Sequence, residues 1–425
     1  MDRVAASPHN PWALRLRGIE AGTLACTFAL AIVAFLVLYP LWLLVLNSFQ
    51  VGTYGATTTW GLDNWRVAFT DPSLSTAMGN TFTLAVTRQA ISLVIAIPVA
   101  WLIARTDLPG RNWLEFGFWI AVFLPPLTAL LGWILLFDGF KGLVNTWLKL
   151  LPFVKQSPFD IFSWWGIIFA HVMGASLGIK IMLLTPAFRS LDSSLEEASR
   201  ASGASTPGTL FRILVPLLAP SILVVTLLGL INALEAFEIE LVLGAPAGID
   251  VYSTKIYRLM RLEPPLYGSA TALSSLILVA LVPLILLQQW LVHRHSYVTV
   301  TGRYRSVLFR LGAWKWMAFA VVGLLVGAMT IVPVLLVILG SFMKVFGAFN
   351  IPNPWTMNNW NDVFKSSGFA SASWNTFVLA TSTSIVAILA FAVLAYISVR
   401  TKFFGRSTLD FLTWIPSLLP GVVMG

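Results

Sequence analysis

The sequence predicts an all-α protein that crosses a membrane several times. Three observations carry this prediction: 57% of the 425 residues are apolar, only 11% are charged, and the charges leave long gaps between them. A soluble domain carries about 25% charged residues, so this chain has too few polar side chains to cover a surface facing water. Helices of about 20 apolar residues would place such segments across a bilayer.

The charge-free gaps locate the membrane helices. Glu115–Asp138 and Arg212–Glu235 each enclose 22 uncharged residues, and Lys365–Arg400 encloses 34. Because a helix needs about 20 residues to cross the hydrocarbon core, each gap is long enough for one span. The first apolar run is too long for a cleavable signal and is predicted to be an anchor helix. We expect helices near 21–47, 81–103, 115–137, 161–185, 213–234, 269–292, 316–340, 375–399 and from 409 onward.

Lys and Arg residues are distributed unevenly over alternate loops. The loops on the side of the N-terminus carry 16 of them, and the loops on the other side carry 9. Because cytoplasmic loops are enriched in Lys and Arg, the N-terminus is predicted to lie in the cytoplasm. The net charge of +9 is then a consequence of membrane topology, and no nucleic-acid partner is expected.

The chain repeats itself at an offset of 295 residues. The pair Asn-Trp at 64–65 recurs at 359–360, and an ungapped comparison of 60–125 with 355–420 gives 21 identities in 66 positions. Shared apolar composition does not explain matching Trp, Asn, Arg and Gly residues in a fixed register. Because six helices separate equivalent points, both halves enter the membrane in the same direction, which makes the repeat a parallel one.

The repeat divides the chain into domains. We expect a cytoplasmic N-terminus over 1–20, a first six-helix domain over 21–292, a basic cytoplasmic linker over 293–315 and a second domain over 316–425. The last residue corresponds to position 130 of the first copy. The second six-helix domain is therefore expected to be incomplete, and the sequence is expected to be truncated.

A polar loop over 190–216 interrupts the apolar spans. Ser194 and Glu197 have the spacing of a capping box, which predicts that a short helix begins there. Gly203 can take the positive φ of a tight turn. The Thr-Pro pair at 206–207 then offers an N-cap and an N1 proline for the next helix. The loop should therefore project a short surface helix that can dock on a soluble partner.

The same loop resembles the EAA coupling loop of type I ABC importer permeases. The family pattern is Glu-Ala-Ala, three residues, Gly, nine residues and Ile-x-Leu-Pro. Here Ser199 replaces an alanine, Val215 replaces the leucine, and Ser202 stands where the family frequently has aspartate. The matching positions are Glu197, Ala198, Ser199, Gly203, Ala204, Ile213 and Pro216.

This resemblance implies a fused, two-half permease in the bacterial plasma (inner) membrane. It implies that the loop docks on a cytoplasmic ABC ATPase dimer and that an extracytoplasmic substrate-binding protein delivers the substrate. The chain itself has no Gly-x-x-x-x-Gly-Lys-Ser/Thr phosphate loop, so ATP hydrolysis is assigned to the partner. We expect no catalytic residue and no bound cofactor in this chain. A second coupling loop would fall near residue 492, beyond the sequence.

The likeness is strongest to permeases of ferric-iron importers, and the stretch 234–257 suggests it. Glu235 and Glu238 have i,i+3 spacing and are expected to share a helix face, where their carboxylates would suit a hard cation. With His171 they are the candidates for lining the translocation path. The alternative for the carboxylates is a solvated position outside the bilayer or a contact with the binding protein. The alternative for His171 is a structural hydrogen bond between helices.

Two further charged residues lie within predicted spans. Lys180 is expected to extend to the cytoplasmic interface. Arg88 is expected to do the same, or to pair with Glu115 or a lipid phosphate. The sequence contains no cluster of Cys or His residues, so no structural metal site is expected. Polyamine, thiamine and phosphonate remain open as substrates, and a secondary transporter driven by an ion gradient remains open as another class.

Overall fold

The computed structural model describes residues 21–52, 58–294 and 308–418. Within these ranges the only paired strands form a short hairpin, β1 (Gln50–Val51) with β2 (Thr59–Trp60). Six of the described helices are long and apolar enough to cross a membrane, and two bent helix pairs could each add a span. The predicted all-α, polytopic fold is confirmed.

The helices of the first repeat follow the predicted order. They are α2 (Ala21–Ser48), α3 (Asp63–Thr70), α4 (Pro72–Arg105), α5 (Arg111–Phe123), α6 (Pro126–Phe137), α7 (Leu143–Leu148), α8 (Trp164–His171), η1 (Val172–Ser176), α9 (Leu177–Arg189), α10 (Ser193–Ala201), α11 (Thr206–Thr209), η2 (Leu210–Leu214), α12 (Val215–Leu217), α13 (Ala219–Leu234), η3 (Glu240–Gly244), α14 (Tyr252–Met260) and α15 (Tyr267–Arg294). The second repeat contributes α16 (Trp314–Ser341), α17 (Asn358–Lys365), α18 (Ser367–Arg400), α19 (Arg406–Trp414) and η4 (Ile415–Leu418).

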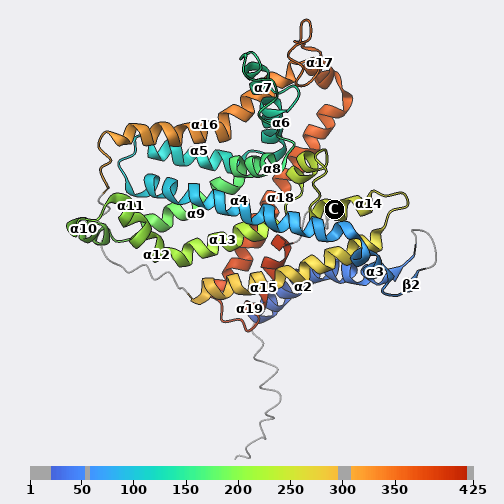
Figure 1. Ribbon diagram of the computed structural model, residues 1–425. Coiled ribbons are helices and arrows are strands. Elements are labelled where there is room, and N and C mark those ends of the chain that lie inside the picture. The colour runs from blue at the N-terminus through green and yellow to red at the C-terminus, as the bar shows by residue number, and fades with distance from the viewer. Residues whose placement is uncertain (1–20, 53–57, 295–307, 419–425) are drawn as a thin grey trace, which may run out of the picture. The chain divides into compact units, whose positions relative to one another are not determined.

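The described residues form two compact units, and each unit contains helices from both repeats. The smaller unit joins 21–47 to 364–418, and the larger unit holds 48–363. In the smaller unit, α2 packs against α18 and α19 through a core that includes Leu30 and Leu409. In the larger unit, α16 lies along α5 and α6 (Figure 1). Since α2 and α16 occupy equivalent positions, each repeat gives its first helix to the helices of the other repeat.

The first copy of the repeat carries a distinctive set of hydrogen bonds at the end of α2. The Asn64 amide donates to the backbone oxygens of Ser48, at 3.2 Å, and Gln50, at 2.7 Å. The Trp65 indole nitrogen donates to the Ser48 hydroxyl at 3.2 Å. Together these bonds satisfy carbonyl groups that the helix end leaves without partners.

The second copy repeats these bonds at the end of α16. The Asn359 amide donates to the backbone oxygens of Ser341, at 3.0 Å, and Met343, at 2.8 Å. The Trp360 indole nitrogen donates to the Ser341 hydroxyl at 3.0 Å. The sequence repeat is therefore also a repeat of local structure.

Two spans that the sequence predicts as single helices are bent. The span expected over 115–137 breaks between α5 and α6, which meet at 98°. The prediction of one straight helix is wrong because Pro125 and Pro126 stand at the break. Proline lacks a backbone donor and disfavours helical geometry in the residue before it. A second bend, of 74°, separates Thr206–Leu217 from Ala219–Leu234.

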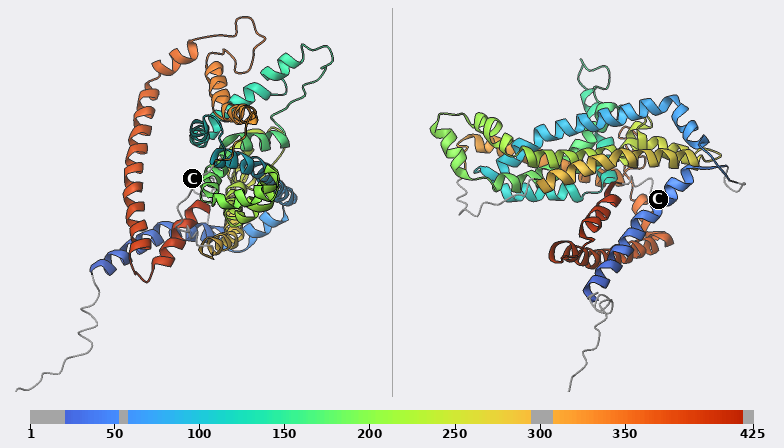
Figure 2. Two further views of the ribbon diagram at one scale, coloured as in Figure 1. Left: turned by 90° about the vertical axis from the view of Figure 1, so that its left-hand side faces the viewer. Right: turned by 90° about the horizontal axis from the view of Figure 1, so that it is seen from below.

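The core of the larger unit lies among α4, α5, α9 and α16, with α13 and α15 beside them. The left-hand view of Figure 2 looks along several of these helices. At the start of α4, the Asp71 carboxylate accepts a hydrogen bond from the Ser73 amide at 2.9 Å and caps the helix. The buried ammonium of Lys255, on α14, hydrogen-bonds to the same carboxylate and is the main reason that the pKa of Asp71 falls from 3.8 to about 2.

Candidate functional site

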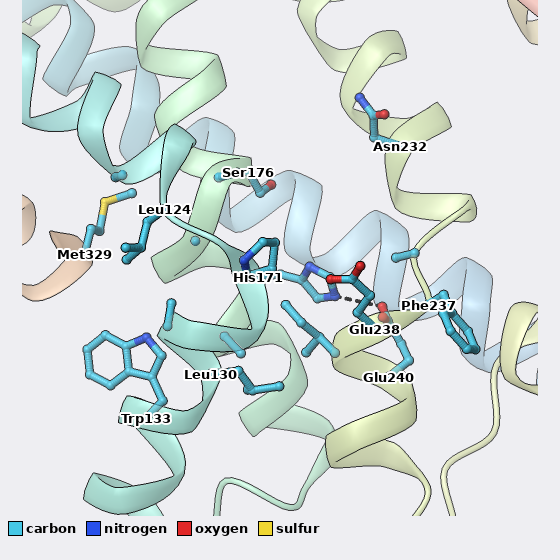
Figure 3. A pocket seen from close by; sticks show the side chains of 18 of the residues that line it. Leu124, Leu130, Trp133, His171, Ser176, Asn232, Phe237, Glu238, Glu240 and Met329 are labelled. Carbon is cyan, nitrogen blue, oxygen red and sulfur yellow. Dashed lines mark hydrogen bonds and ion pairs between the residues drawn. The ribbon is translucent and has the colours of Figure 1, made fainter. Parts of the chain in front are cut away.

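A cavity of about 770 Å³ lies in the larger unit, where the bent and interrupted helices meet. Its wall comes from the α5–α6 bend, from α8 and η1, from the segment after α13, and from α16. In Figure 3, Glu238 and Glu240 lie on one side of the view, and Trp133 and Met329 lie on the other. The polar residues that line it are His171, Ser176, Asn232, Glu235, Glu238 and Glu240.

The cavity exists because several helices are interrupted around it. The α5–α6 break places Leu124 and Pro126 in its wall. On the facing span, Gly174 lies inside η1 with φ −100° and ψ −152°, which is not a helical conformation. No atom lies within 4 Å of the position that a Gly174 side chain would take. Turns of this wider helical type are frequent at functional sites.

Glu240 is the centre of a buried ion cluster in the cavity wall. One of its carboxylate oxygens lies 3.1 Å from an Arg88 guanidinium nitrogen. The same oxygen lies 2.7 Å from His171 Nε2 (Figure 3). The Glu240 and Arg88 side chains are 3% and 5% exposed. A buried charge of this kind is tolerated when a partner compensates it. The cluster therefore joins three helical segments, α4, α8 and η3, at the cavity.

Sequence reasoning assigned Arg88 to the wrong surroundings. The guanidinium neither extends to a lipid phosphate nor pairs with Glu115, because it lies inside the bundle against Glu240. Glu115 pairs instead with Arg189, at the end of α9. The gap of 152 residues between Arg88 and Glu240 explains why no local pattern signalled this pair.

Lys180 also differs from its prediction. Its side chain does not reach the cytoplasmic interface. Its ammonium donates to the backbone oxygen and the hydroxyl of Ser176, both at 3.0 Å, and the residue is only 2% exposed. Because Ser176 lines the cavity, Lys180 supports the cavity wall from behind.

Glu235 and Glu238 both line the cavity, although they do not share one helix face as predicted. The helix α13 ends at Leu234, and a non-helical stretch separates the two residues. Within the part of the chain that the structure describes, the buried Glu235 Oε1 has no hydrogen-bond partner. Glu238 is exposed to the cavity.

The cavity is rich in carboxyl groups but is not arranged as a chelating site. Arg88 compensates Glu240, which leaves Glu235 and Glu238 without an ion pair among the residues that the structure describes. Over the same described ranges, no three His, Cys, Asp or Glu side chains are grouped as ligands for one metal ion. The arrangement can attract a cation without holding it in a closed coordination shell.

The polar loop forms one end of the bundle, at the left in Figure 1. Gly203 has φ +77° with open space around it, which confirms the predicted tight turn. The start of α10 is set by Asp192, whose carboxylate accepts from the Ser194 amide at 2.9 Å. The α11 cap is Ser205, one residue before the predicted position. The exposed residues of the matched pattern are Glu197, Ala198, Gly203, Ala204 and Pro216, and Ile213 is half-buried.

The inner side of α10 is tied to the bundle. The Ser199 hydroxyl lies 2.8 Å from the Thr209 hydroxyl and joins α10 to α11. The Glu196 carboxylate pairs with Arg105, at the end of α4, at 2.9 Å, and both side chains are at most 5% exposed. The exposed side of α10 is therefore free for a partner, while the inner side is fixed to a long helix.

Comparison with known proteins decides the family. Residues 92–297 match the model of the binding-protein-dependent transport system inner membrane component. This segment belongs to that permease family. It contains the whole loop over 190–216 and every cavity-lining residue named above except Met329.

Named relatives of the permease support the same assignment. It is 29% identical over 323 residues to the ferric transport system permease protein FbpB of Actinobacillus pleuropneumoniae, covering 72% of this chain and 44% of that protein. It is 30% identical over 314 residues to putative ferric transport system permease protein FbpB 1 of Haemophilus influenzae, covering 72% and 48%. The chain thus spans about half the length of these curated relatives.

Solved structures show the same fold. A crystal structure of a bacterial ABC transporter that imports alginate matches with a TM-score of 0.54 at 22% identity, over 66% of this chain and 99% of that one. Other relatives have different substrates in their names, including a sulfate permease of Synechococcus elongatus, which is 27% identical over 50% of this chain and 74% of its own. The permease is therefore a multi-pass membrane protein with the transmembrane fold of ABC importers.

Proposed function

We propose that this permease forms the translocation path of an ATP-driven importer for ferric iron. The observation that carries the proposal is the cavity with Glu235 and Glu238 in its wall, among interrupted helices. Carboxyl oxygens are the preferred partners of hard cations. The names of two ferric-transport relatives support the same substrate.

The loop over 190–216 is the proposed docking site for a separate cytoplasmic ABC ATPase. Its exposed face carries Glu197 and Ala198, and its inner face is fixed to α4 through Glu196. Closure of an ATPase dimer would move α10 and, with it, the spans that line the cavity. In this proposal the N-terminus and the loop lie on the cytoplasmic side of the bacterial inner membrane.

The opposite end of the path is proposed to receive substrate from an extracytoplasmic binding protein. One matching crystal structure shows an alginate importer in complex with a pentasaccharide-bound periplasmic protein. That match has a TM-score of 0.52 and supports a comparable arrangement here. The alternatives are a permease for polyamine, thiamine or phosphonate, and a gradient-driven secondary transporter.

Reconstitution with the ATPase and the binding protein in proteoliposomes tests the proposal. We expect radiolabelled ferric iron to enter only with ATP. The variant Gly203→Val should lower uptake strongly, because a β-branched side chain is strained at φ +77° and distorts the turn that follows α10. Glu235→Gln with Glu238→Gln should lower uptake without lowering assembly of the complex.

The outcomes separate the classes. ATP hydrolysis without iron uptake would keep the importer and reject ferric iron, and polyamine or thiamine would be tested next. Uptake that ignores both ATP and the Gly203 variant would reject the ATP-driven importer. A matched control is Gly327→Ala, at a position with open space and no positive φ, which should transport normally.

A further inference from the structure

The described end of the segment that joins the two repeats, from residue 308 onward, is attached to the end of α4, close to the coupling loop. The Phe309 amide donates to the Arg105 oxygen at 2.8 Å, and the Asp107 amide donates to the Phe309 oxygen at 3.1 Å. The Leu311 amide donates to the Asp107 carboxylate at 2.7 Å. These three bonds hold residues 309–311 beside the end of α4, where Phe309 and Thr106 form an isolated β-bridge; we call this segment the docked strand.

Side-chain packing holds the same strand in place. The Phe309 ring lies 5.9 Å from the ring of Trp101, which is buried on α4. Phe309 and Trp101 line a small cavity together with Glu196, Thr209 and Leu214. The strand therefore contacts the region where Glu196 of α10 meets Arg105 of α4.

The strand is linked directly to the wall of the translocation cavity. Gly312, with φ +61°, makes a turn, and α16 begins at Trp314. Further along α16, Val326 contacts α5 opposite Gly117, and Met329 lines the cavity. A displacement at Arg105 can thus pass through these hydrogen bonds to residues 309–311, and from there along α16 to the cavity wall.

We infer that the docked strand Phe309–Leu311 is a transmission element, which carries the movement of α10 through Arg105 to α16. This inference rests on the proposed function. Arg105, Asp107 and Phe309 are positioning residues in it, since none of them lines the cavity. The strand lets the first coupling loop act on the first helix of the second repeat.

Spin-label distances test the inference without any substrate. The permease is assembled with its ATPase, after Cys26→Ser removes the one cysteine of this sequence. One label pair joins Asn232→Cys to Leu335→Cys, on the exposed face of α16, and its distance reports the movement of α16 relative to α13. The reference pair joins Asn232→Cys to the exposed Ile179→Cys, within the first repeat. Distances are measured with and without a non-hydrolysable ATP analogue.

Two insertions on either side of the docked strand separate transmission from linker length. Two glycines after Gly312 interrupt the route to α16, and two glycines after Thr301 lie on the other side of the strand. We expect the first insertion to lower the nucleotide-dependent population shift of the Leu335 pair about three-fold or more, within the range found along coupling networks. The second insertion should leave that shift unchanged, and the reference pair should shift in both.

Point variants guard against an insertion that fails to assemble. Phe309→Ala removes the ring contact with Trp101, and Phe140→Ala removes an equally large ring that is 89% exposed. We expect only Phe309→Ala to reduce the shift of the Leu335 pair.

Three results would overturn the inference or its basis. An undiminished Leu335 shift after the Gly312 insertion would show that α16 moves without the strand. Equal losses from both insertions would show that only linker length matters. If neither label pair responds to nucleotide in the uninterrupted permease, the proposed ATP coupling fails, and the inference fails with it.

Discussion

The ion cluster at Glu240 allows a quantitative test of how the cavity is held together. Replacing Glu240 by Gln removes the carboxylate that Arg88 and His171 share, and it leaves a guanidinium buried at 5% exposure without a counter-charge. Breaking a buried pair by removing one partner costs about 3–5 kcal/mol. Arg88→Met should also be destabilising, because the Glu240 carboxylate, buried at 3% exposure, then keeps only its contact with His171.

The double variant distinguishes an ion pair from two independent effects. With both charges removed, no uncompensated charge remains, so Arg88→Met with Glu240→Gln should cost about 2–3 kcal/mol less than the sum of the single variants. The free energies of unfolding are measured by titrating the purified permease with SDS in mixed micelles and following tryptophan fluorescence. Glu238→Gln is the matched control, since Glu238 lines the same cavity and has no ion pair among the described residues, and it should cost less than about 1 kcal/mol.

Additivity would refute the reasoning. If the two single costs sum to the double cost within about 0.5 kcal/mol, the charges do not stabilise each other. The same conclusion would follow if Glu240→Gln were as mild as Glu238→Gln. In either case the cavity would be held by apolar packing, and the three helical segments would be free to separate there.

Three further predictions concern other parts of the larger unit. The pKa of Asp71 lies at about 2 in the folded protein and at 3.8 without its partners. Its contribution to the free energy of unfolding is therefore present above about pH 4 and is lost as the pH falls toward 2. Asp71→Asn should remove this dependence in a pH series of unfolding titrations. Asn64→Ala and Asn359→Ala should each lower the unfolding free energy by about 1–3 kcal/mol, because each variant leaves two carbonyls without a donor. A loss of stability in Asn64→Ala without one in Asn359→Ala would contradict the structural repeat. Gly132→Ala should lower the unfolding free energy by about 1–3 kcal/mol in the same titration, because its new carbon would lie 2.5 Å from the α16 backbone. Gly327→Ala has open space around it and should be neutral or stabilising. Equal effects of the two variants would argue against the packing of α16 on α6.

The sequence was sufficient for features that depend on local pattern. The charge-free runs located the apolar helices. The repeat of Asn-Trp at 64–65 and 359–360 predicted two related halves, and the two copies make the same hydrogen bonds. The positive φ of Gly203 followed from its residue type and its place between two helix signals.

Features that depend on distant segments could not be read in the same way. No local pattern distinguishes Glu240, because its partner Arg88 lies 152 residues away and belongs to another helix. The separation of Glu235 from Glu238 arises because α13 ends at Leu234, and no glycine or proline marks that end. By contrast, Pro125 and Pro126 did mark the break between α5 and α6, but an uncharged run was given more weight than two adjacent helix breakers.

The exchange of first helices has a consequence for biosynthesis. The surface of α6 around Gly132 is completed by the α16 backbone at Pro333, about 200 residues later in the chain. At about 5–20 residues per second, a ribosome needs about 10–40 s to supply that helix after Gly132 has been made. During this interval the surface of the α5–α6 bend that α16 later covers faces lipid, a chaperone or the insertion machinery. Nascent permease would therefore be most vulnerable to membrane proteases in that interval, before its second half has begun to enter the bilayer.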